Sequence, residues 1–315
     1  MKNFIFTLLL VFPFITCCAN GTGADTLVNN VLNNLSGSGN EDGVLQKIII
    51  PPMPKEASFA GEEMPLDLFD VYESLQRELI TITHWHGSFI YIMQLAGRHQ
   101  AFVEKILEEE GMHPDFFYLC VAESSLQPTS SPANAKGYWQ FLATTGKEFG
   151  LEINSQVDER YNWEKSTRAA CKYLKKAYEK YGTWTLAAAS YNVGMANIDS
   201  RIGYQSLKNY YDMQLPIETA RYIYRAVALK TIMNNPKAYG FYIEKDQLYK
   251  PIECKEVIVK GAIENWSNFA AKHNTNFKMI KMLNEWIRSN RLDNKYGKTY
   301  KVLVPVDGAR KSSHK

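Results

Sequence analysis

The sequence has little of what several enzyme classes require. Its six His residues are scattered, and no phosphate-binding loop, Ser-His-Asp set or paired Cys motif stands out. Lys and Arg number 36 against 33 Asp and Glu, an excess too small to indicate a nucleic-acid partner. His84 and His86 have a spacing that would chelate a metal only on a strand, whereas this region has a helical pattern. We therefore expect no metal, no cofactor and no nucleic-acid partner.

An apolar run near the N-terminus is too short to span a bilayer comfortably. It extends from Phe4 to Ile15 after a single Lys, whereas a membrane helix needs roughly 20 apolar residues. These features are typical of an export signal. We expect a signal peptide at residues 1–18 and export to the periplasm.

Two cysteines directly follow the apolar run. Cys17 and Cys18 resemble the lipobox of bacterial lipoproteins, in which the first mature cysteine is acylated. The small Gly or Ala that usually precedes that cysteine is missing, so plain cleavage after Ala19 or Ala24 is the alternative. We favour the lipid anchor, which would hold the protein at the outer membrane.

Composition and periodicity divide the rest of the chain into domains. With 315 residues, 45% of them hydrophobic, the chain can bury one substantial core and a smaller second one. Residues 19–63 are rich in Asn, Gly and Ser and then in Pro and Glu, which predicts a flexible linker. A helical pattern follows, and it predicts a mainly α domain over residues 64–245. The fold class is therefore mainly α with a small α+β module.

The α+β module lies after Pro251. The segments EVIVKG and TYKVLVP alternate like strands and enclose two short helical stretches. This order predicts a βααβ module at residues 251–306 whose terminal strands pair. The basic tail at residues 307–315 is predicted to be disordered.

Two helices of the α domain can be delimited from residue types. Apolar residues recur at helical spacing in residues 166–181, which predicts a helix that Ser166 caps and Gly182 ends. Another predicted helix begins near Pro114 and runs through FFYLCVA almost without a polar residue, so it should be buried on all sides. Its Cys120, like Cys171, is better interpreted as a small buried apolar residue than as half of a disulfide.

Glu123 closes the predicted buried helix and is the strongest candidate for chemistry. It lies on the helix face of Phe116, Leu119 and Cys120, at spacings of seven, four and three. Desolvation by these neighbours and the negative end of the helix dipole both raise the pKa of a carboxyl group. A general acid needs such a shift, because an ordinary Glu titrates near about 4.3. The alternative is a Glu that simply turns to solvent.

A series of local motifs surrounds and follows Glu123. They occur in LCVAESSLQPTSSPANAKGYWQFLATTGKEFGL, LAAASYNVGMANI and LPIETARYIYRAVAL. These segments resemble the family 1 lytic transglycosylases of bacterial peptidoglycan, and most closely their membrane-bound type D branch. The resemblance covers roughly residues 64–245 and implies a lysozyme-like catalytic domain of the goose-type and soluble lytic transglycosylase kind. The matching residues are Glu123 and Ser124 for the Glu-Ser pair, Gly137, Tyr138, Trp139 and Gln140 for Gly-x-x-Gln, Ser190, Tyr191 and Asn192 for Ala-Tyr-Asn, and Glu218, Thr219 and Tyr222 for Glu-Thr-x-x-Tyr.

The resemblance implies a role for each matched residue. Glu123 would be the catalytic acid and base, and Tyr191 would help to orient it. The other residues expected to contact the substrate are Ser124, Tyr138, Trp139, Gln140, Asn192, Glu218 and Tyr222. Aromatic residues at positions 138 and 139 would either stack on sugar rings or belong to the core. Trp139 replaces the Met common elsewhere in the family, and Ser190 replaces Ala.

The matched motifs provide a single carboxylate for the reaction centre, whereas most glycosidases use two. Asp158, Glu159 and Glu164 lie in a separate stretch that we interpret as helix entry and surface charge. The acetamido oxygen of N-acetylmuramic acid would then serve as the second partner. The resemblance thus implies non-hydrolytic cleavage of peptidoglycan strands. A lysozyme-like hydrolase and a non-catalytic wall-binding scaffold are the alternatives.

The βααβ module resembles a LysM domain, which is a small glycan-binding fold. Trp266, Asn284 and the closing VLVP match, but the stretch between Asn284 and Tyr300 is longer than usual. The resemblance implies binding to peptidoglycan glycan strands. A degenerate module that only packs on the α domain is the alternative.

Overall fold

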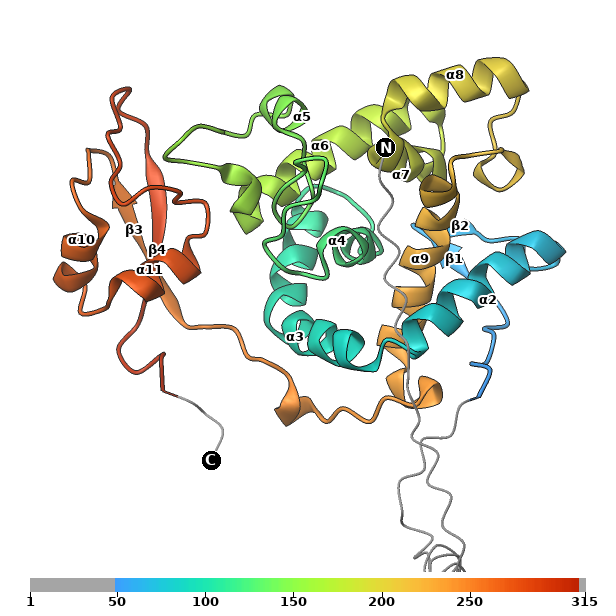
Figure 1. Ribbon diagram of the computed structural model, residues 1–315, viewed down its shortest axis with the longest axis horizontal. Helices are drawn as coiled ribbons and strands as arrows, with labels where there is room; N and C mark the ends of the chain where they lie inside the picture. The colour runs from blue at the N-terminus through green and yellow to red at the C-terminus, as the bar shows by residue number, and fades with distance from the viewer. Residues whose placement is uncertain (1–48, 312–315) are drawn as a thin grey trace, which may run out of the picture. The chain divides into compact units, whose positions relative to one another are not determined.

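The computed structural model describes residues 49–311, and from Ile50 onwards these belong to one compact unit (Figure 1). The predicted signal peptide, Cys17, Cys18 and most of the predicted linker lie outside the described residues. The mainly α fold class is confirmed. The elements are β1 (Ser58–Phe59), β2 (Glu62–Glu63), α2 (Phe69–Thr83), α3 (His86–Glu109), α4 (Phe116–Ser124), α5 (Ala143–Glu148), α6 (Trp163–Tyr181), α7 (Trp184–Val193), α8 (Met195–Gln205), α9 (Ile217–Asn234), β3 (Cys254–Val259), α10 (Trp266–Lys272), α11 (Phe277–Leu283) and β4 (Tyr300–Pro305), with short 3-10 turns at Glu159–Tyr161, Tyr210–Asp212, Pro236–Tyr239 and Lys245–Gln247.

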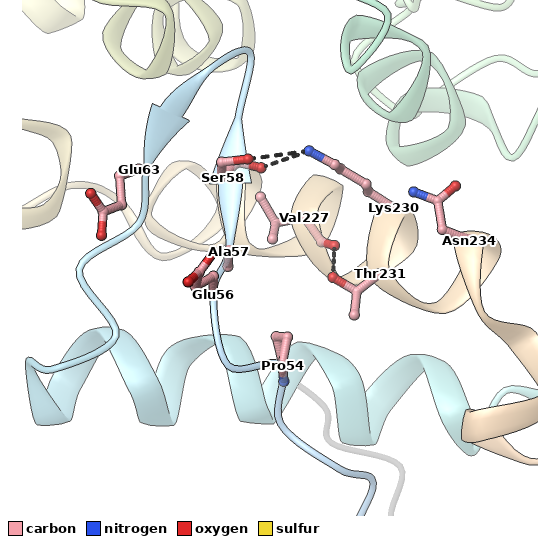
Figure 2. A pocket seen from close by; sticks show the side chains of 9 residues that line it. All are labelled: Pro54, Glu56, Ala57, Ser58, Glu63, Val227, Lys230, Thr231 and Asn234. Atoms are coloured by element: carbon pink, nitrogen blue, oxygen red, sulfur yellow. Dashed lines mark hydrogen bonds between the residues drawn. The ribbon is translucent and has the colours of Figure 1, made fainter.

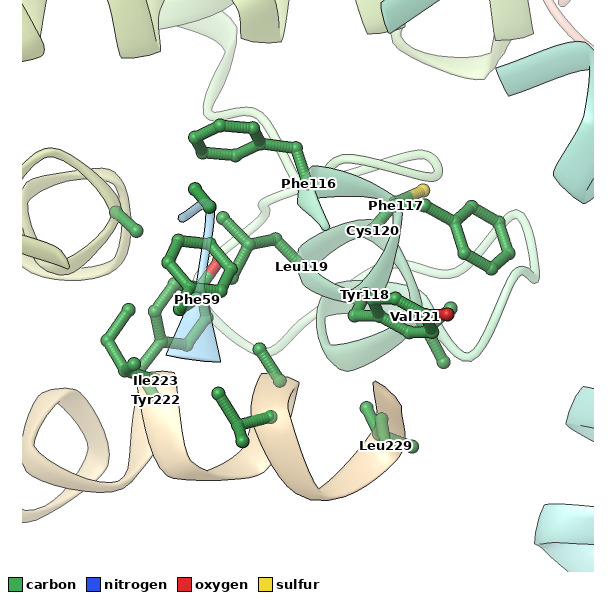
Figure 3. Close-up of a cluster of buried hydrophobic side chains, with 14 of the residues drawn as sticks. Phe59, Phe116, Phe117, Tyr118, Leu119, Cys120, Val121, Tyr222, Ile223 and Leu229 are labelled. Atoms are coloured by element: carbon green, nitrogen blue, oxygen red, sulfur yellow. The ribbon is translucent and has the colours of Figure 1, made fainter. Parts of the chain in front are cut away.

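Helix α4 is the centre of the α domain, as its apolar sequence predicts. Its residues from Phe116 to Val121 are all buried. It packs against α3 and α9, and Figure 3 shows its side chains beside Tyr222 and Ile223 of α9. Because α4 is buried along most of its length, a polar side chain on its last turn is largely shielded from water.

The N-terminal hairpin of β1 and β2 corrects the predicted extent of the linker. Residues 58–63 were expected to be flexible, but Phe59 is 1% exposed and its ring meets that of Phe116 edge-on at 5.4 Å. The carboxylate of Glu62 accepts hydrogen bonds from the backbone N–H groups of Trp184 and Thr185, at 2.5 and 2.9 Å. The hairpin therefore adds one aromatic side chain to the core and caps the N-terminus of α7.

Helix α6 begins earlier than predicted. Asn162 is its N-cap and accepts a hydrogen bond from the Lys165 N–H at 3.0 Å. Ser166 is not the cap, because it is fully buried and donates its hydroxyl to the Asn162 carbonyl oxygen at 2.6 Å. The predicted end is confirmed: Gly182 has φ of 78°, the left-handed conformation that favours glycine.

The charged stretch before α6 is also corrected. Asp158 and Glu159 were interpreted as surface charges, yet they are 6% and 3% exposed. Asp158 accepts two hydrogen bonds from the buried Arg160 guanidinium, at 2.9 and 2.7 Å, and Glu159 pairs with Lys165. The paired partners offset the desolvation that makes a lone buried carboxylate unfavourable.

The C-terminal module has the predicted βααβ order, and β3 and β4 pair antiparallel with Cys254 opposite Pro305 and Val259 opposite Tyr300. Trp266 is fully buried in its core. The side-chain amide of Asn284 bonds to both the N–H and the carbonyl of Leu303 at 2.8 Å, which joins the end of α11 to β4. Residues 307–311, predicted as part of a disordered tail, form turns, and residues 312–315 lie outside the described range.

This module shares its hydrophobic core with the α domain. Val157 and Tyr161, which precede α6, are 1% and 6% exposed and pack among the apolar residues of the module. Backbone groups also pair across the contact, since the Asp158 N–H donates to the Trp286 carbonyl at 2.9 Å and the Arg288 N–H donates to the Gln156 carbonyl at 2.8 Å. The module is therefore packed on the α domain and not connected to it by a linker alone.

The remaining features concern cysteines, membrane spans and metals. Cys120, Cys171 and Cys254 are all free, and the first two are fully buried as small core residues. None of the helices in residues 49–311 combines the length and the apolar content that a membrane span requires. Over the same range, no His, Cys, Asp and Glu side chains form a group of three or more that could hold a metal.

Candidate active site

Glu123 lies on the last turn of α4, where the chain turns sharply away. Ser125 and Leu126 both adopt left-handed conformations, with φ of 53° and 59°, so the helix ends just after Glu123. Neighbouring side chains enclose the Glu123 carboxyl group, while the residue as a whole is partly exposed to solvent. Tyr222 of α9, which is 1% exposed, donates its hydroxyl to Oε1 of Glu123 at 2.5 Å. A buried tyrosine thus fixes the orientation of the carboxyl group.

Burial raises the pKa of Glu123 from 4.5 to about 7. The hydrogen bond from Tyr222 and the positive charge of Arg225 both lower this pKa, while the negative charge of Glu218 raises it. The desolvation is larger than these opposing effects, so Glu123 keeps its proton to a higher pH than an ordinary Glu does. A carboxyl group in this state can donate a proton and then accept one.

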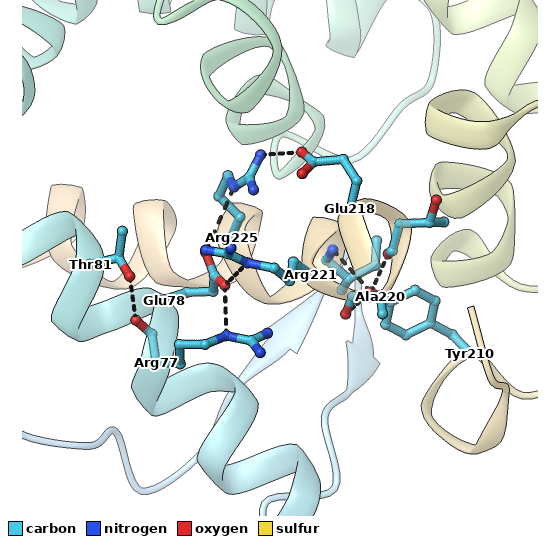
Figure 4. A network of polar contacts seen from close by, with 10 residues as sticks. Arg77, Glu78, Thr81, Tyr210, Glu218, Ala220, Arg221 and Arg225 are labelled. Atoms are coloured by element: carbon cyan, nitrogen blue, oxygen red, sulfur yellow. Dashed lines mark hydrogen bonds and ion pairs between the residues drawn. The ribbon is translucent and has the colours of Figure 1, made fainter. Parts of the chain in front are cut away.

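Arg225 belongs to a polar network that the sequence analysis did not identify (Figure 4). Its centre is Glu78 of α2, which is 1% exposed and accepts hydrogen bonds from the Arg221 guanidinium at 2.6 and 3.2 Å. Arg225 lies 3.7 Å from Glu78 and 2.8 Å from Glu218. Because these two carboxylates share Arg225, its charge lowers the pKa of Glu123 less than an unpaired arginine would. The sequence does contain a signal for this network, because Glu78 is an acidic residue on the buried helix face of Val71, Leu75 and Ile82.

The two tyrosines near Glu123 have different contacts from those expected. Tyr191 was expected to orient Glu123, but its hydroxyl donates to the Trp139 carbonyl oxygen at 2.7 Å. Burial raises the pKa of Tyr191 well above its usual value, and the charge of Glu123 raises it further. Tyr222, expected to contact substrate, makes the hydrogen bond to Glu123 instead. The hydroxyl group that contacts the Glu123 carboxyl group therefore belongs to Tyr222.

The segment Gly137 to Gln140 forms a tight turn that only glycine permits at its first position. Gly137 has φ of 81°, and a Cβ there would lie 1.9 Å from the carbonyl oxygen of Arg160. Tyr138 and Trp139 are 4% and 0% exposed, and the Trp139 indole N–H donates to Thr167 at 2.9 Å. Neither ring can stack on a sugar, so their predicted contact with substrate is corrected to a place in the core. Gln140 is half-buried and donates its amide to the Gly137 carbonyl at 2.7 Å.

The other predicted substrate contacts are divided between the interior and the surface. Ser124 is 5% exposed and donates to the Cys120 carbonyl at 3.2 Å. Asn192 is half-buried and accepts a hydrogen bond from the Thr219 hydroxyl at 2.8 Å. Thr219 precedes Tyr222 by three residues on α9. Glu218 is exposed and paired with Arg225, which lowers its pKa. Glu123, Tyr222 and Tyr191 are thus brought together, and Asn192 lies beside the same helix α9.

Comparison with known proteins agrees with this arrangement. Residues 101–214 match the model of the transglycosylase SLT domain. This part of the chain is similar to an SLT domain. Residues 255–308 match the soluble lytic transglycosylase C-terminal LysM-like domain. The chain is also similar to the membrane-bound lytic murein transglycosylase D of Escherichia coli strain K12 and of strain O6:H1 (CFT073), at 26% identity over 196 residues in each case. This alignment covers 58% of the chain and 42% of each relative, so the chain spans less than half the length of the curated relatives it matches.

The SLT match includes Glu123, Gln140 and Asn192 but ends before α9. Tyr222, which makes the direct hydrogen bond to Glu123, lies eight residues beyond the matched range. The contacts of Glu123 therefore extend beyond the matched range, to α9.

A cavity of about 620 Å³ lies beside the N-terminal hairpin of β1 and β2 and is lined by none of the predicted site residues (Figure 2). Its lining side chains are Pro54, Glu56, Ala57, Ser58, Glu63, Val227, Lys230, Thr231 and Asn234. The Lys230 ammonium in its wall donates to the Ser58 carbonyl at 3.1 Å and pairs with Asp115 at 2.7 Å. Through these contacts Lys230 joins the hairpin to α9.

Proposed function

We propose that this protein is a lytic transglycosylase that cleaves the β-1,4 bond between N-acetylmuramic acid and N-acetylglucosamine in peptidoglycan. The single observation that carries the proposal is Glu123, an enclosed carboxyl group with a pKa of about 7 and a hydrogen bond from a buried tyrosine. The match to the SLT domain and the similarity to two murein transglycosylases support the same reaction class.

In the proposed first step, protonated Glu123 donates its proton to the glycosidic oxygen. The bond between that oxygen and the anomeric carbon breaks, and the acetamido oxygen of N-acetylmuramic acid closes on the carbon. This substrate assistance replaces a second carboxylate. Glu218 is a poor substitute for one, because it is exposed and already paired with Arg225.

In the proposed second step, ionised Glu123 removes the proton from the C6 hydroxyl of the same sugar. That oxygen then attacks the anomeric carbon and displaces the acetamido oxygen, giving a 1,6-anhydro end. An intramolecular hydroxyl reacts without the entropy cost of recruiting a water molecule. Glu123 ends protonated, as it began, so the cycle needs no other acid or base.

We propose that Ser124, Gln140 and Asn192 contact the sugar hydroxyl and acetamido groups. Gln140 and Asn192 each use one end of the amide for an internal hydrogen bond, and this leaves the Gln140 oxygen and the Asn192 nitrogen for substrate. The LysM-like module is proposed to bind glycan strands.

Mass analysis of products from purified sacculi tests the proposal. We expect muropeptides with 1,6-anhydro ends, whose mass is lower by one water than that of hydrolysis products. Products that gain water would indicate the lysozyme-like hydrolase. Sacculi left intact by the full-length protein would indicate the wall-binding scaffold.

The proposed location is the cell envelope, with export to the periplasm and a lipid anchor in the outer membrane. The apolar run before Cys17 and Cys18 supports it, as does the description of both relatives as membrane-bound. Changing Cys17 and Cys18 to Ala is expected to move the protein from the membrane fraction to the soluble fraction, because an acyl chain contributes about 0.8 kcal/mol per buried CH₂. Fractionation with immunoblotting measures this, and a variant that stays in the membrane fraction would contradict the anchor.

A further inference from the structure

One side chain of the LysM-like module reaches into the motif region of the SLT domain. Glu285 follows α11 and accepts the hydroxyl hydrogen of Tyr138, which is 4% exposed. The Tyr138 ring also stacks on the ring of Trp163, with centroids 3.5 Å apart and an interplanar angle of 16°. Tyr138 is therefore held between a helix of the SLT domain and a carboxyl group of the module.

A separate chain of contacts leads from the module to the same turn. The Trp286 carbonyl accepts the backbone N–H of Asp158 at 2.9 Å, and Asp158 holds the guanidinium of Arg160 with two hydrogen bonds. That guanidinium donates to the Phe141 carbonyl at 3.1 Å. The carbonyl of Arg160 faces Gly137 so closely that no side chain fits there. Arg160 thus contacts both ends of the turn at residues 137–141, Phe141 through its guanidinium and Gly137 through its carbonyl.

The turn in turn contacts the surroundings of Glu123. The Cys120 thiol, one helical turn before Glu123, donates to the Tyr138 carbonyl at 3.5 Å. The Tyr191 hydroxyl donates to the Trp139 carbonyl at 2.7 Å. Gln140 has φ of 47° and keeps this unusual backbone conformation beside its hydrogen bond to Gly137. A displacement of this turn would therefore move the Gln140 amide and the Tyr191 side chain together.

We propose that Glu285 is a positioning residue for the SLT active site and that it acts by holding Tyr138, and with it the turn at residues 137–141. The proposal rests on the proposed lytic transglycosylase activity. It gives the LysM-like module a role in turnover that is separate from any glycan binding. Catalytic groups must be held close to their productive geometry, so a loosened turn lowers the rate of the chemical step more than substrate capture.

Kinetics on soluble glycan strands with full-length variants test this role. Glu285→Ala is expected to lower kcat about tenfold and to leave KM within about twofold, because the hydrogen bond that holds Tyr138 is lost. Glu285→Gln is expected to retain wild-type kcat, since the amide oxygen can still accept the Tyr138 hydroxyl. Tyr138→Phe should match Glu285→Ala, and the double variant should lose no more than either. Glu264→Ala, an exposed position in the same module, is the control.

Hydrogen exchange gives a readout that does not depend on activity. In Glu285→Ala, peptides covering residues 137–141 are expected to exchange at least about tenfold faster, while α10 and the β3 and β4 strands keep their protection. Wild-type kcat in Glu285→Ala, equal losses in Ala and Gln variants, or faster exchange spread over the whole chain would each overturn the proposal. An inactive wild-type protein would instead contradict the proposed function, while the exchange result would still decide whether Glu285 holds the turn.

Discussion

Replacing Glu123 with Gln is expected to lower the formation of anhydro products by about 10²- to 10⁴-fold, which is the usual contribution of a general acid or base. The reason is that Glu123 is proposed to move a proton in both steps, and a Gln amide can do neither at neutral pH. Gln has nearly the same size, and its side-chain oxygen can still accept the Tyr222 hydroxyl that Glu123 accepts at 2.5 Å. Product formation from purified sacculi, followed by mass, measures the loss.

The matched control is Glu179→Gln on the exposed face of α6. It makes the same change of charge and volume outside the site and should keep wild-type activity. Binding of both variants to sacculi should equal that of wild type, because neither change alters Ser124, Gln140 or Asn192, and Gln has nearly the size of Glu. Full activity of Glu123→Gln would show that another group supplies the proton.

Local patterns were sufficient to predict the surroundings of Glu123. The apolar run through α4 indicated that the helix would be buried and that Glu123 would be desolvated, and both features are present. These properties depend on residues within one or two helical turns, whose spacing the sequence gives directly. The order of elements in the C-terminal module was predictable for the same reason.

Contacts between distant segments were not predictable from such patterns. The spacing of residues in α9 does not show that Tyr222 lies closer to the Glu123 carboxyl group than Tyr191 does, because the answer depends on how α4, α7 and α9 pack. Glu78 is separated from Arg221 by 143 positions. The burial of Phe59 was not predicted, because the residues around it are mostly polar. A single aromatic side chain can nevertheless anchor a hairpin.

The exposure of Trp139 illustrates a further limit. An aromatic residue inside a motif fits equally a sugar platform and a core position, and only the surrounding helices decide between them. Trp139 is fully buried and its indole is satisfied by Thr167. Similarly, Val157 and Tyr161 precede α6 in sequence, but their apolar side chains complete the core of the C-terminal module.

The raised pKa of Glu123 also predicts an effect on stability. Its pKa is about 7 in the folded protein and 4.5 in the reference state, so between these values the folded protein binds a proton that the unfolded chain has released. Stability from this group is therefore fully present below pH 4.5 and is lost as the pH rises through 7. The loss is roughly 3 to 4 kcal/mol of unfolding free energy, for a shift of about 2.5 pKa units at about 1.4 kcal/mol per unit.

Glu123→Gln cannot ionise and should escape this loss. We expect the difference in unfolding free energy, variant minus wild type, to become roughly 3 kcal/mol more positive between about pH 4 and about pH 8. Urea titrations of both proteins at the two pH values measure it, and taking the difference cancels the groups that titrate in both. Glu179→Gln should show no such change, because it replaces a solvated carboxylate. A constant difference across the range would mean that Glu123 ionises as freely in the fold as in water, and the proton that the proposed reaction requires would then be absent at neutral pH.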